Sequence, residues 1–223
     1  GGTDEDGAYF IQQTADGGYI VAGYSYSNDG DVSGNHGSSD YWVVKLNATG
    51  SIQWQKSLGG TSSDRAISIQ QTADGGYIVA GSSFSNDGDV SGNQGDFDYR
   101  VVKLNSSGGI LWQKSLGGTS LDAAGSIQPT SDGGYIVTGY SGSNDGDVSG
   151  NHGDDDYWVV KLNATGIIQW QKSLGGNVRD QALSVRPTAD GGYIVAGYSY
   201  SNDGDVSGNH GDYDCWIVKL APP

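Results

Sequence analysis

Apolar and polar residues alternate with a period of two along most of this 223-residue chain, and glycine-rich turns interrupt the alternation at short intervals. A two-residue period is typical of β-strands, because successive side chains point to opposite faces. In residues 59–116 the pattern predicts four strands, over 66–72, 76–83, 98–105 and 110–116. No segment has the period of an amphipathic helix, so the sequence predicts an all-β chain.

This pattern recurs four times. The motif Asp-Gly-Gly-Tyr begins at Asp16, Asp74, Asp132 and Asp190, which gives a constant period of 58 residues. The stretch Thr-Ala-Asp-Gly-Gly predicts a tight hairpin turn, with aspartate as a cap and glycine at positive φ. The repeats are 1–58, 59–116, 117–174 and 175–223. The last repeat ends before its fourth strand, so 15 strands are expected rather than 16.

The number of apolar faces differs between the strands of a repeat. The second and third strands are apolar on both faces, whereas the fourth alternates, with Ile52, Trp54 and Leu58 on one side. Small antiparallel sheets stacked on copies of themselves give this pattern, so we predict one β-propeller domain over residues 1–223, with a last blade that lacks its outer strand. Two arrangements remain open: a ring closed within one chain, or an open arc whose unpaired edge recruits a strand from elsewhere.

The loop between the second and third strands is acidic and rich in glycine; in the first repeat residues 28–40 read NDGDVSGNHGSSD. Counted from Asp29, oxygen-bearing side chains stand at positions 1, 3, 5, 7 and 12, with glycine at position 6. Ca²⁺ prefers six to eight oxygen ligands, and alternate residues of a tight loop point inward. The spacing resembles the calcium loop of EF-hands and, more closely, the calcium hairpins of integrin-type propeller repeats. It departs from the EF-hand because position 12 is aspartate instead of glutamate and strands replace the flanking helices.

We therefore predict up to four Ca²⁺ ions, one in each repeat. The predicted ligands are Asp29, Asp31, Ser33, Asn35 and Asp40; Asp87, Asp89, Ser91, Asn93 and Asp98; Asp145, Asp147, Ser149, Asn151 and Asp156; and Asp203, Asp205, Ser207, Asn209 and Asp214. Four ions would add eight positive charges to a net charge of −15, leaving −7. Because the loop shows no apolar anchor of its own, calcium is expected to stabilise the fold. The alternative is an ordinary Asp/Asn/Gly turn copied by duplication.

Several other residues recur at fixed positions. Aspartates precede each first strand and are expected to cap their turns. The alternatives are that they complete a calcium shell or line a ligand surface; they are Asp6, Asp64, Asp122 and Asp180. His36, His152 and His210 are expected to face solvent. The tryptophans are expected to pack between sheets rather than to stack on sugars. Aromatic residues at the end of the second strand are the candidates for an exposed binding rim: Tyr24, Tyr26, Phe84, Tyr140, Tyr198 and Tyr200.

Three Asn-X-Ser/Thr sequences are candidate glycosylation sites, at Asn47, Asn105 and Asn163. Each also has the composition of a hairpin turn between the third and fourth strands, so the match can equally be accidental.

Composition narrows the function classes. Eleven Lys and Arg against 26 acidic residues argue against nucleic acid as a partner. No apolar run approaches the roughly 20 residues that span a bilayer. The single cysteine, Cys215, stands where the other repeats have tyrosine, which excludes an intrachain disulfide framework. No nucleophile with its base, histidine cluster or repeated glutamate pair occurs, so we do not expect an enzyme.

The full repeat string, DGGYIVAGYS followed by SNDGDVSGNHG, DYWVVKLNATG and WQKSLGG, resembles tandem propeller-type repeats of secreted and cell-surface proteins of bacteria and archaea. The resemblance implies an extracellular or cell-surface location. It favours a calcium-stabilised structural or adhesive protein, with a homo-oligomer or filament neighbour joined at the incomplete blade. The rival hypothesis is a lectin-like protein that binds a glycan or a surface protein.

Overall fold

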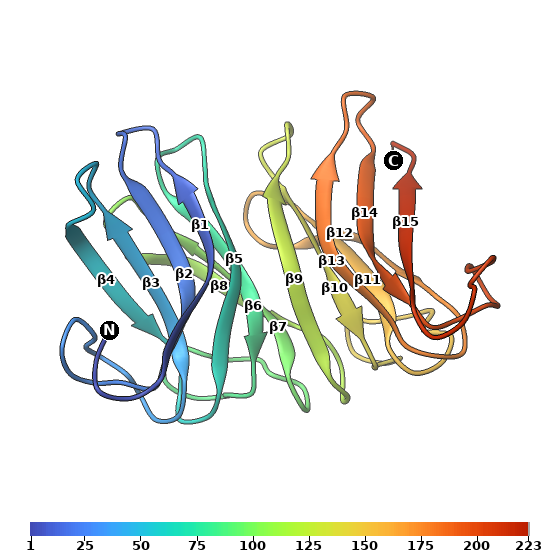
Figure 1. The fold of residues 1–223 in the computed structure, drawn as a ribbon, viewed down its shortest axis with the longest axis horizontal. Coiled ribbons are helices and arrows are strands. Elements are labelled where there is room, and N and C mark those ends of the chain that lie inside the picture. The colour runs from blue at the N-terminus through green and yellow to red at the C-terminus, as the bar shows by residue number, and fades with distance from the viewer. Residues whose placement is uncertain (223) are drawn as a thin grey trace. The chain divides into compact units, whose positions relative to one another are not determined.

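The chain is entirely β in the computed structural model, which describes residues 1–222; no helix occurs among them, and so none that could span a membrane (Figure 1). Fifteen strands form four antiparallel sheets, three with four strands and one with three. In each sheet the strands are ordered as they follow in the chain, which is the order that hairpin turns produce. The predicted repeats and strand count are confirmed.

Each repeat forms one sheet. The first consists of β1 (Asp6–Gln13), β2 (Tyr19–Ser25), β3 (Asp40–Leu46) and β4 (Ile52–Leu58). The second consists of β5 (Asp64–Gln71), β6 (Tyr77–Ser83), β7 (Asp98–Leu104) and β8 (Ile110–Leu116). The third consists of β9 (Asp122–Pro129), β10 (Tyr135–Ser141), β11 (Asp156–Leu162) and β12 (Ile168–Leu174). The fourth consists of β13 (Asp180–Pro187), β14 (Tyr193–Ser199) and β15 (Asp214–Leu220).

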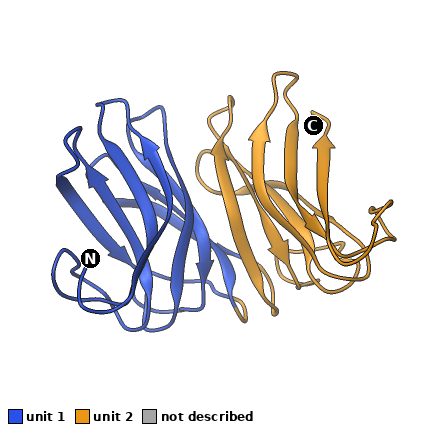
Figure 2. Ribbon diagram, viewed as in Figure 1, with its two compact units in different colours: residues 1–93, 97–116 blue, residues 94–96, 117–223 orange. Residues whose placement is uncertain are grey.

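The chain divides into two compact units of two sheets each (Figure 2). Unit 1 comprises residues 1–93 and 97–116, and unit 2 comprises residues 94–96 and 117 onward. In unit 1, β5 packs against β2, β1 and β3; in unit 2, β13 packs against β10, β9 and β11. In each unit, the first strand of the second sheet therefore packs on one face of the first sheet.

The core of each unit lies between its two sheets. In unit 1 it includes the fully buried Ile20, Tyr41 and Ile69. The ring of Trp54 on β4 lies 5.8 Å from the ring of Tyr77 in the second sheet, and Trp170 has the same relation to Tyr193 in unit 2. These two tryptophans pack between sheets, as expected from their apolar position on an alternating strand.

The hairpin turns have the predicted chemistry. In the second repeat the Thr72 amide donates to the Gly76 carbonyl at 2.9 Å, Asp74 accepts from the Gly76 amide at 3.0 Å, and Gly75 has φ of +78°. Lys103 of β7 is almost completely buried and reaches both carboxylate oxygens of Asp74, at 2.9 and 3.0 Å. The turn is thus fixed both by its own residues and by a cation from the third strand.

Candidate functional site

The acidic loop of the first repeat is built by its own short-range contacts. The side-chain oxygen of Asn28 accepts from the Gly34 amide at 3.0 Å, and the Val32 amide donates to the Asp29 carbonyl at 3.0 Å. Val32 is only 2% exposed, so the expectation that the loop lacks an apolar anchor is wrong. The equivalent valines of the other loops are buried as well: Val90, Val148 and Val206.

The five predicted calcium ligands of this loop contact five different partners. Asp29 accepts from the Thr3 amide and hydroxyl, both at 2.8 Å, and Asp31 lies 3.1 Å from the amino group of Gly1. Ser33 accepts from a β4 glutamine side chain, and the Asn35 amide donates to the Ser25 carbonyl at 2.8 Å.

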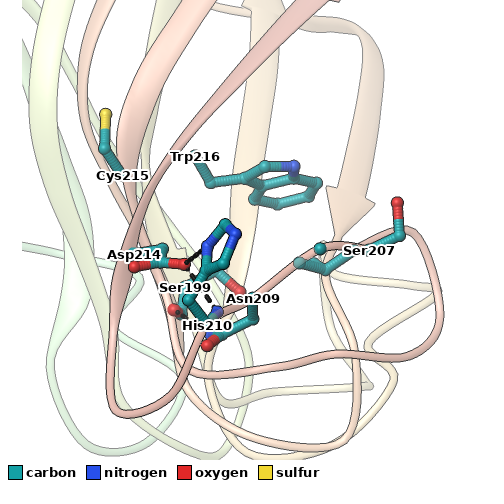
Figure 3. Close-up of a pocket in the computed structure, with 9 residues that line it drawn as sticks. Ser199, Ser207, Asn209, His210, Asp214, Cys215 and Trp216 are labelled. Carbon is teal, nitrogen blue, oxygen red and sulfur yellow. Dashed lines mark hydrogen bonds and ion pairs between the residues drawn. The ribbon is translucent and has the colours of Figure 1, made fainter.

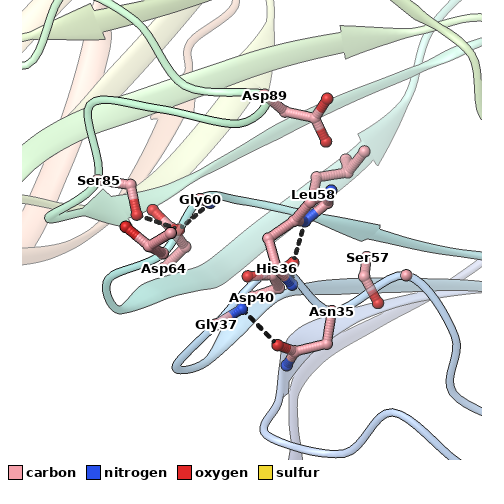
Figure 4. Close-up of polar contacts among 12 residues, drawn as sticks. Asn35, His36, Gly37, Asp40, Ser57, Leu58, Gly60, Asp64, Ser85 and Asp89 are labelled. Atoms are coloured by element: carbon pink, nitrogen blue, oxygen red, sulfur yellow. Dashed lines mark hydrogen bonds and ion pairs between the residues drawn. The ribbon is translucent and has the colours of Figure 1, made fainter.

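Asp40, the last of the five, is buried at the start of β3. Its Oδ2 atom lies 2.6 Å from Nδ1 of His36, whose side chain is 37% exposed (Figure 4). Burial raises the pKa of Asp40 to about 6, and the hydrogen bond from His36 opposes that rise. His36 therefore does not simply face solvent: its ring contacts a buried carboxylate.

The equivalent positions of the other repeats have similar partners, with differences at positions 3, 5 and 12. Position 1 binds the turn before the first strand, through the pairs Asp87 with Thr61, Asp145 with Thr119, and Asp203 with Asn177. At position 3, the Asp89 carbonyl accepts from the Arg100 side chain, and the carboxylates of Asp147 and Asp205 accept from the amides of Gly117 and Gly175. At position 5, Ser91 and Ser149 accept from glutamine side chains.

The last two positions lie nearer the third strand. At position 7, the side-chain amides of Asn93, Asn151 and Asn209 donate to the carbonyls of Ser83, Ser141 and Ser199. At position 12, Asp98 and Asp156 are fully buried, whereas the side chain of Asp214 is 39% exposed.

Residues 1–222 contain no group of three His, Cys, Asp or Glu side chains arranged to hold a metal ion. In the first repeat each of the five side chains has a hydrogen-bond or ion-pair partner of its own. Calcium binding by the chain stays a prediction.

Two cavities lie along β15 in the fourth sheet. A pocket of about 310 Å³ lies beside β15 and is lined by residues including Ser207, His210 and Trp216 (Figure 3). A second cleft, of about 400 Å³, lies at the end of the same strand and is lined by Trp170, Lys172, Leu220 and Ala221.

The same place in the first sheet is filled by β4. There Gln55 donates to the Ser33 hydroxyl at 2.6 Å and accepts from Trp42 Nε1 at 3.1 Å. The Ser57 hydroxyl donates to the Ser33 carbonyl at 3.1 Å. A bulge in β4 also directs Gln53 to Lys45 Nζ, at 3.1 Å.

The third sheet repeats these contacts. Gln171 of β12 accepts from Trp158 Nε1 at 2.8 Å and bonds to the Ser149 hydroxyl. Ser173 donates to the Ser149 carbonyl at 3.0 Å.

In the fourth sheet the equivalent tryptophan, serine and lysine are present, but no fourth strand in the described part of the chain supplies the glutamine and serine partners. Trp216 Nε1 and the Ser207 hydroxyl make no hydrogen bond within residues 1–222, and Lys219 Nζ contacts only Asp190 and the Leu220 carbonyl. Sequence reasoning identified the open edge, but it did not identify the glutamine and serine positions that hold a fourth strand in place.

Exposed tyrosines cluster at the loop ends of the sheets. In unit 2 the rings of Tyr198, Tyr200 and Tyr213 lie 5.3 to 6.0 Å from one another, and Tyr213 is 56% exposed. In unit 1 the guanidinium of Arg65 lies 5.1 Å from the ring of Tyr24. Of the predicted rim residues, Phe84 is 47% exposed. The hydroxyl of Tyr26, a half-buried residue, accepts from the Arg65 guanidinium at 3.0 Å.

The asparagines of the candidate glycosylation sites act as turn caps. The side-chain oxygen of Asn47 accepts from the Thr49 amide, the Thr49 hydroxyl and the Ser51 amide at 2.8 to 3.0 Å. Asn105 and Asn163 make the same contacts in their turns. This geometry explains the sequence of the turn without a glycan, and glycosylation stays a prediction.

Comparisons with known proteins place few limits on this site. No protein-family model matches the chain. The regulatory protein FlaEY of Caulobacter vibrioides is 30% identical over 187 residues, which cover 78% of this chain and 20% of that protein. The chain thus spans about one fifth of the curated relative that it matches. A protein of unknown function from Bacteroides caccae, whose crystal structure was determined at 1.35 Å resolution, has a TM-score of 0.40 and 13% identity, covering 86% of this chain and 71% of that one.

Proposed function

We propose that this chain is a non-enzymatic structural and adhesive repeat protein of the cell surface or extracellular space, whose sheets are blades of a β-propeller stabilised by calcium. Its assembly function is the acceptance of an extended strand along the outer edge of β15. The uniform repeat, the sheet order and the stacking of sheets within each unit support the propeller. The single observation that carries the assembly function is that Trp216 Nε1 and the Ser207 hydroxyl, which line a pocket beside β15, lack within residues 1–222 the hydrogen-bond partners that their equivalents have in the first and third sheets.

Strand addition explains why these groups stand where they do. An exposed strand edge offers a row of backbone donors and acceptors, and side-chain pockets along it supply specificity. On β15 the pocket beside Trp216 and Ser207 corresponds to the place where Gln55 and Gln171 dock in the first and third sheets. The partner we propose is therefore a strand with the fourth-strand pattern Ile-Gln-Trp-Gln-Lys-Ser-Leu.

A labelled peptide tests this proposal. The peptide has the sequence of residues 167–174, IIQWQKSL, carries fluorescein, and is titrated with the full chain while its anisotropy is followed. The antiparallel register of β11 with β12 predicts that its serine will face Trp216 and its second glutamine will face Val218. Changing that glutamine to leucine removes two hydrogen bonds, to Ser207 and from Trp216, of about 1 kcal/mol each, which weakens binding roughly thirtyfold.

Matched variants of the chain show where the peptide binds. Ser207→Ala removes one of these two bonds and is expected to weaken peptide binding about fivefold. Ser149→Ala serves as the control, because Ser149 already holds a glutamine of β12 and lies away from the β15 edge. Binding no tighter than that of a scrambled peptide of the same composition would refute the strand-accepting function. Light scattering of the chain alone then distinguishes self-assembly, with a mass above one chain, from acceptance of a strand that residues 1–223 do not supply.

The tyrosine cluster of unit 2 supports a second candidate function, that of a lectin-like protein. Three tyrosines within stacking distance, two of them substantially exposed, form the kind of aromatic surface that binds sugar rings. Glycan-array screening tests this function, with Tyr213→Ala as the variant expected to lose binding. A chain that retains glycan binding after this change uses another surface.

A further inference from the structure

Two buried aspartates face one another where the two sheets of unit 1 meet. Asp40 begins β3 and Asp64 begins β5, and both are fully buried. Asp64 Oδ2 lies 2.7 Å from the position that a Cβ atom would take on Gly59, and Asp40 Oδ1 lies closer still to the same position. Glycine at position 59 is therefore what allows both carboxylates to reach this point.

The two carboxylates differ in their partners (Figure 4). Asp64 accepts from the Ser83 hydroxyl, from the Ser85 hydroxyl at 2.8 Å and from the Gly60 amide at 2.9 Å. Asp64 thus has three hydrogen-bond donors, two hydroxyls and one amide. The Gly60 contact also confirms that this aspartate caps its turn.

Asp40 uses only one of its two oxygens. Oδ2 accepts from the amide of His36 at 3.1 Å and contacts its ring, whereas Oδ1 is buried and has no hydrogen-bond partner in the described part of the chain. No Lys or Arg side chain among residues 1–222 forms an ion pair with either aspartate. A buried carboxylate oxygen without a donor or counter-charge is costly, so a partner beyond these residues is expected.

We propose that this pair, and not the acidic loop, is the calcium site of the repeat, with Asp40 Oδ1 and Asp64 Oδ2 as its two charged ligands. Two carboxylates, with two serine hydroxyls bonded to one of them, supply the hard oxygen ligands that Ca²⁺ prefers. The proposal explains why the last loop aspartate is fully buried, while the carboxylates of Asp29 and Asp31 are held at the surface by other groups. It replaces the loop as the metal centre and does not depend on the strand-accepting edge.

Unit 2 contains the same arrangement. Asp180 Oδ2 lies 2.6 Å from the Cβ position of Gly175, and Asp156 Oδ1 again lies closer. Both aspartates are fully buried, and Oδ1 of each has no hydrogen-bond partner in the described residues. Asp180 also caps its turn, accepting from the Gly176 amide at 2.8 Å. Each unit therefore offers one such site.

Calcium titration of the full chain tests the assignment. The chain is stripped with EGTA, dialysed and titrated with CaCl₂ alone in a calorimeter. Asp64→Asn removes one charge from the pair, and Asp31→Asn removes one charge from the exposed loop as the matched control. We expect Asp64→Asn to lower the number of ions bound per chain by one and Asp31→Asn to leave it unchanged.

A stability measurement provides a second, independent readout. Without calcium, Asp40→Asn removes a buried carboxylate charge whose Oδ1 atom has no donor, at nearly constant volume, so its thermal midpoint is expected to rise above that of the unmodified chain. With saturating calcium the order reverses, because only the unmodified chain gains from the ion. If Asp64→Asn does not fold, Asp180→Asn with Asp205→Asn as its control repeats the comparison in unit 2.

Two results would overturn the proposal. Loss of one ion on Asp31→Asn, with none lost on Asp64→Asn, would return the site to the loop. No calcium binding by the unmodified chain, together with a thermal midpoint that rises as the pH falls toward 5, would show that the pair shares a proton instead. Failure of the β15 peptide to bind has no bearing on either result.

Discussion

Arg100 is the third-strand residue at which the tryptophan of the other repeats, Trp42, Trp158 and Trp216, is replaced. Its guanidinium is fully buried, donates to the Leu58 carbonyl at 2.8 Å and lies 5.0 Å from a tyrosine ring. Its Nε atom has no hydrogen-bond partner, and no carboxylate within residues 1–222 forms an ion pair with it. We predict that Arg100→Trp will stabilise unit 1.

The neighbouring glutamine indicates why. Gln113 Oε1 is buried without a partner, whereas the equivalent Gln55 and Gln171 accept from a tryptophan Nε1. Arg100→Trp supplies an indole N–H that can donate to Gln113 Oε1, and it removes the arginine Nε atom that has no partner. Each buried polar group without a hydrogen bond costs about 1–3 kcal/mol. The lost carbonyl bonds of the guanidinium oppose this gain, but replacement of a buried ion by a well-packed apolar group is often stabilising by about 1–4 kcal/mol. We expect a net gain of about 1–3 kcal/mol.

Unit 2 shows that a tryptophan fits this position. Tyr157 and Trp216 have ring centroids 4.6 Å apart, and the Tyr157 hydroxyl donates to the Trp216 carbonyl at 3.0 Å. The Tyr41 hydroxyl makes the same bond to the Arg100 carbonyl, also at 3.0 Å. The substitution therefore copies a contact that the chain already forms.

Urea denaturation followed by circular dichroism measures the effect. The free energy of unfolding falls with urea concentration by about 2 kcal/mol per molar. If this slope is unchanged, a gain of about 1–3 kcal/mol raises the urea midpoint by roughly 0.5–1.5 M. Arg100→Met is the control, because it removes the charge without supplying a donor to Gln113, and it is expected to give a smaller gain. A lower midpoint for Arg100→Trp than for the unmodified chain would show that the carbonyl bonds outweigh the buried charge, and would refute the reasoning.

Three further predictions concern turns. Lys103 holds the pKa of Asp74 at about 2, below its ordinary 3.8, so this pair adds stability above about pH 4 that is lost as the pH falls toward 2. In Lys103→Met the free energy of unfolding should therefore depend less on pH between about 4 and 2. The same pH dependence in the variant and the unmodified chain would contradict this. Gly75→Ala should lower the free energy of unfolding by about 1 kcal/mol, because only the positive φ at this position disfavours alanine. Gly76→Ala places a Cβ atom against a β7 carbonyl and should lower the free energy of unfolding clearly more. Equal urea midpoints for the two variants would count against the described turn. Asn47→Ala should cost about 1 kcal/mol in the same assay through loss of its cap, and no change would show that the cap contributes little.

Most of the fold could be predicted from the sequence, because its determinants are local and repeat without insertion. The predicted strands of the second repeat differ from β5–β8 by at most two residues at either end. The largest difference is at the first strand, which begins at Asp64 rather than at residue 66, because the aspartate is paired with Ser83 in the β5–β6 ladder.

The candidate site was less predictable, because ligand spacing does not show where side chains point. Asp29, Asp31 and Ser33 have the spacing of a calcium loop, yet each is engaged by a different segment: the Thr3 turn, the first residue and β4. The burial of Val32 was also missed, since a single valine in a polar loop gives no periodic signal.

The sequence by itself determined the repeat, the strand count, the hairpin turns and the incomplete last sheet, since hydrophobic period and turn chemistry act over a few residues. Only the tertiary structure decided which residues meet across sheets. It brings Asp40 beside Asp64, although they belong to different repeats, and leaves Trp216 and Ser207 without the partners that their equivalents have. Such contacts depend on how whole sheets stack, which residue spacing within one repeat does not encode.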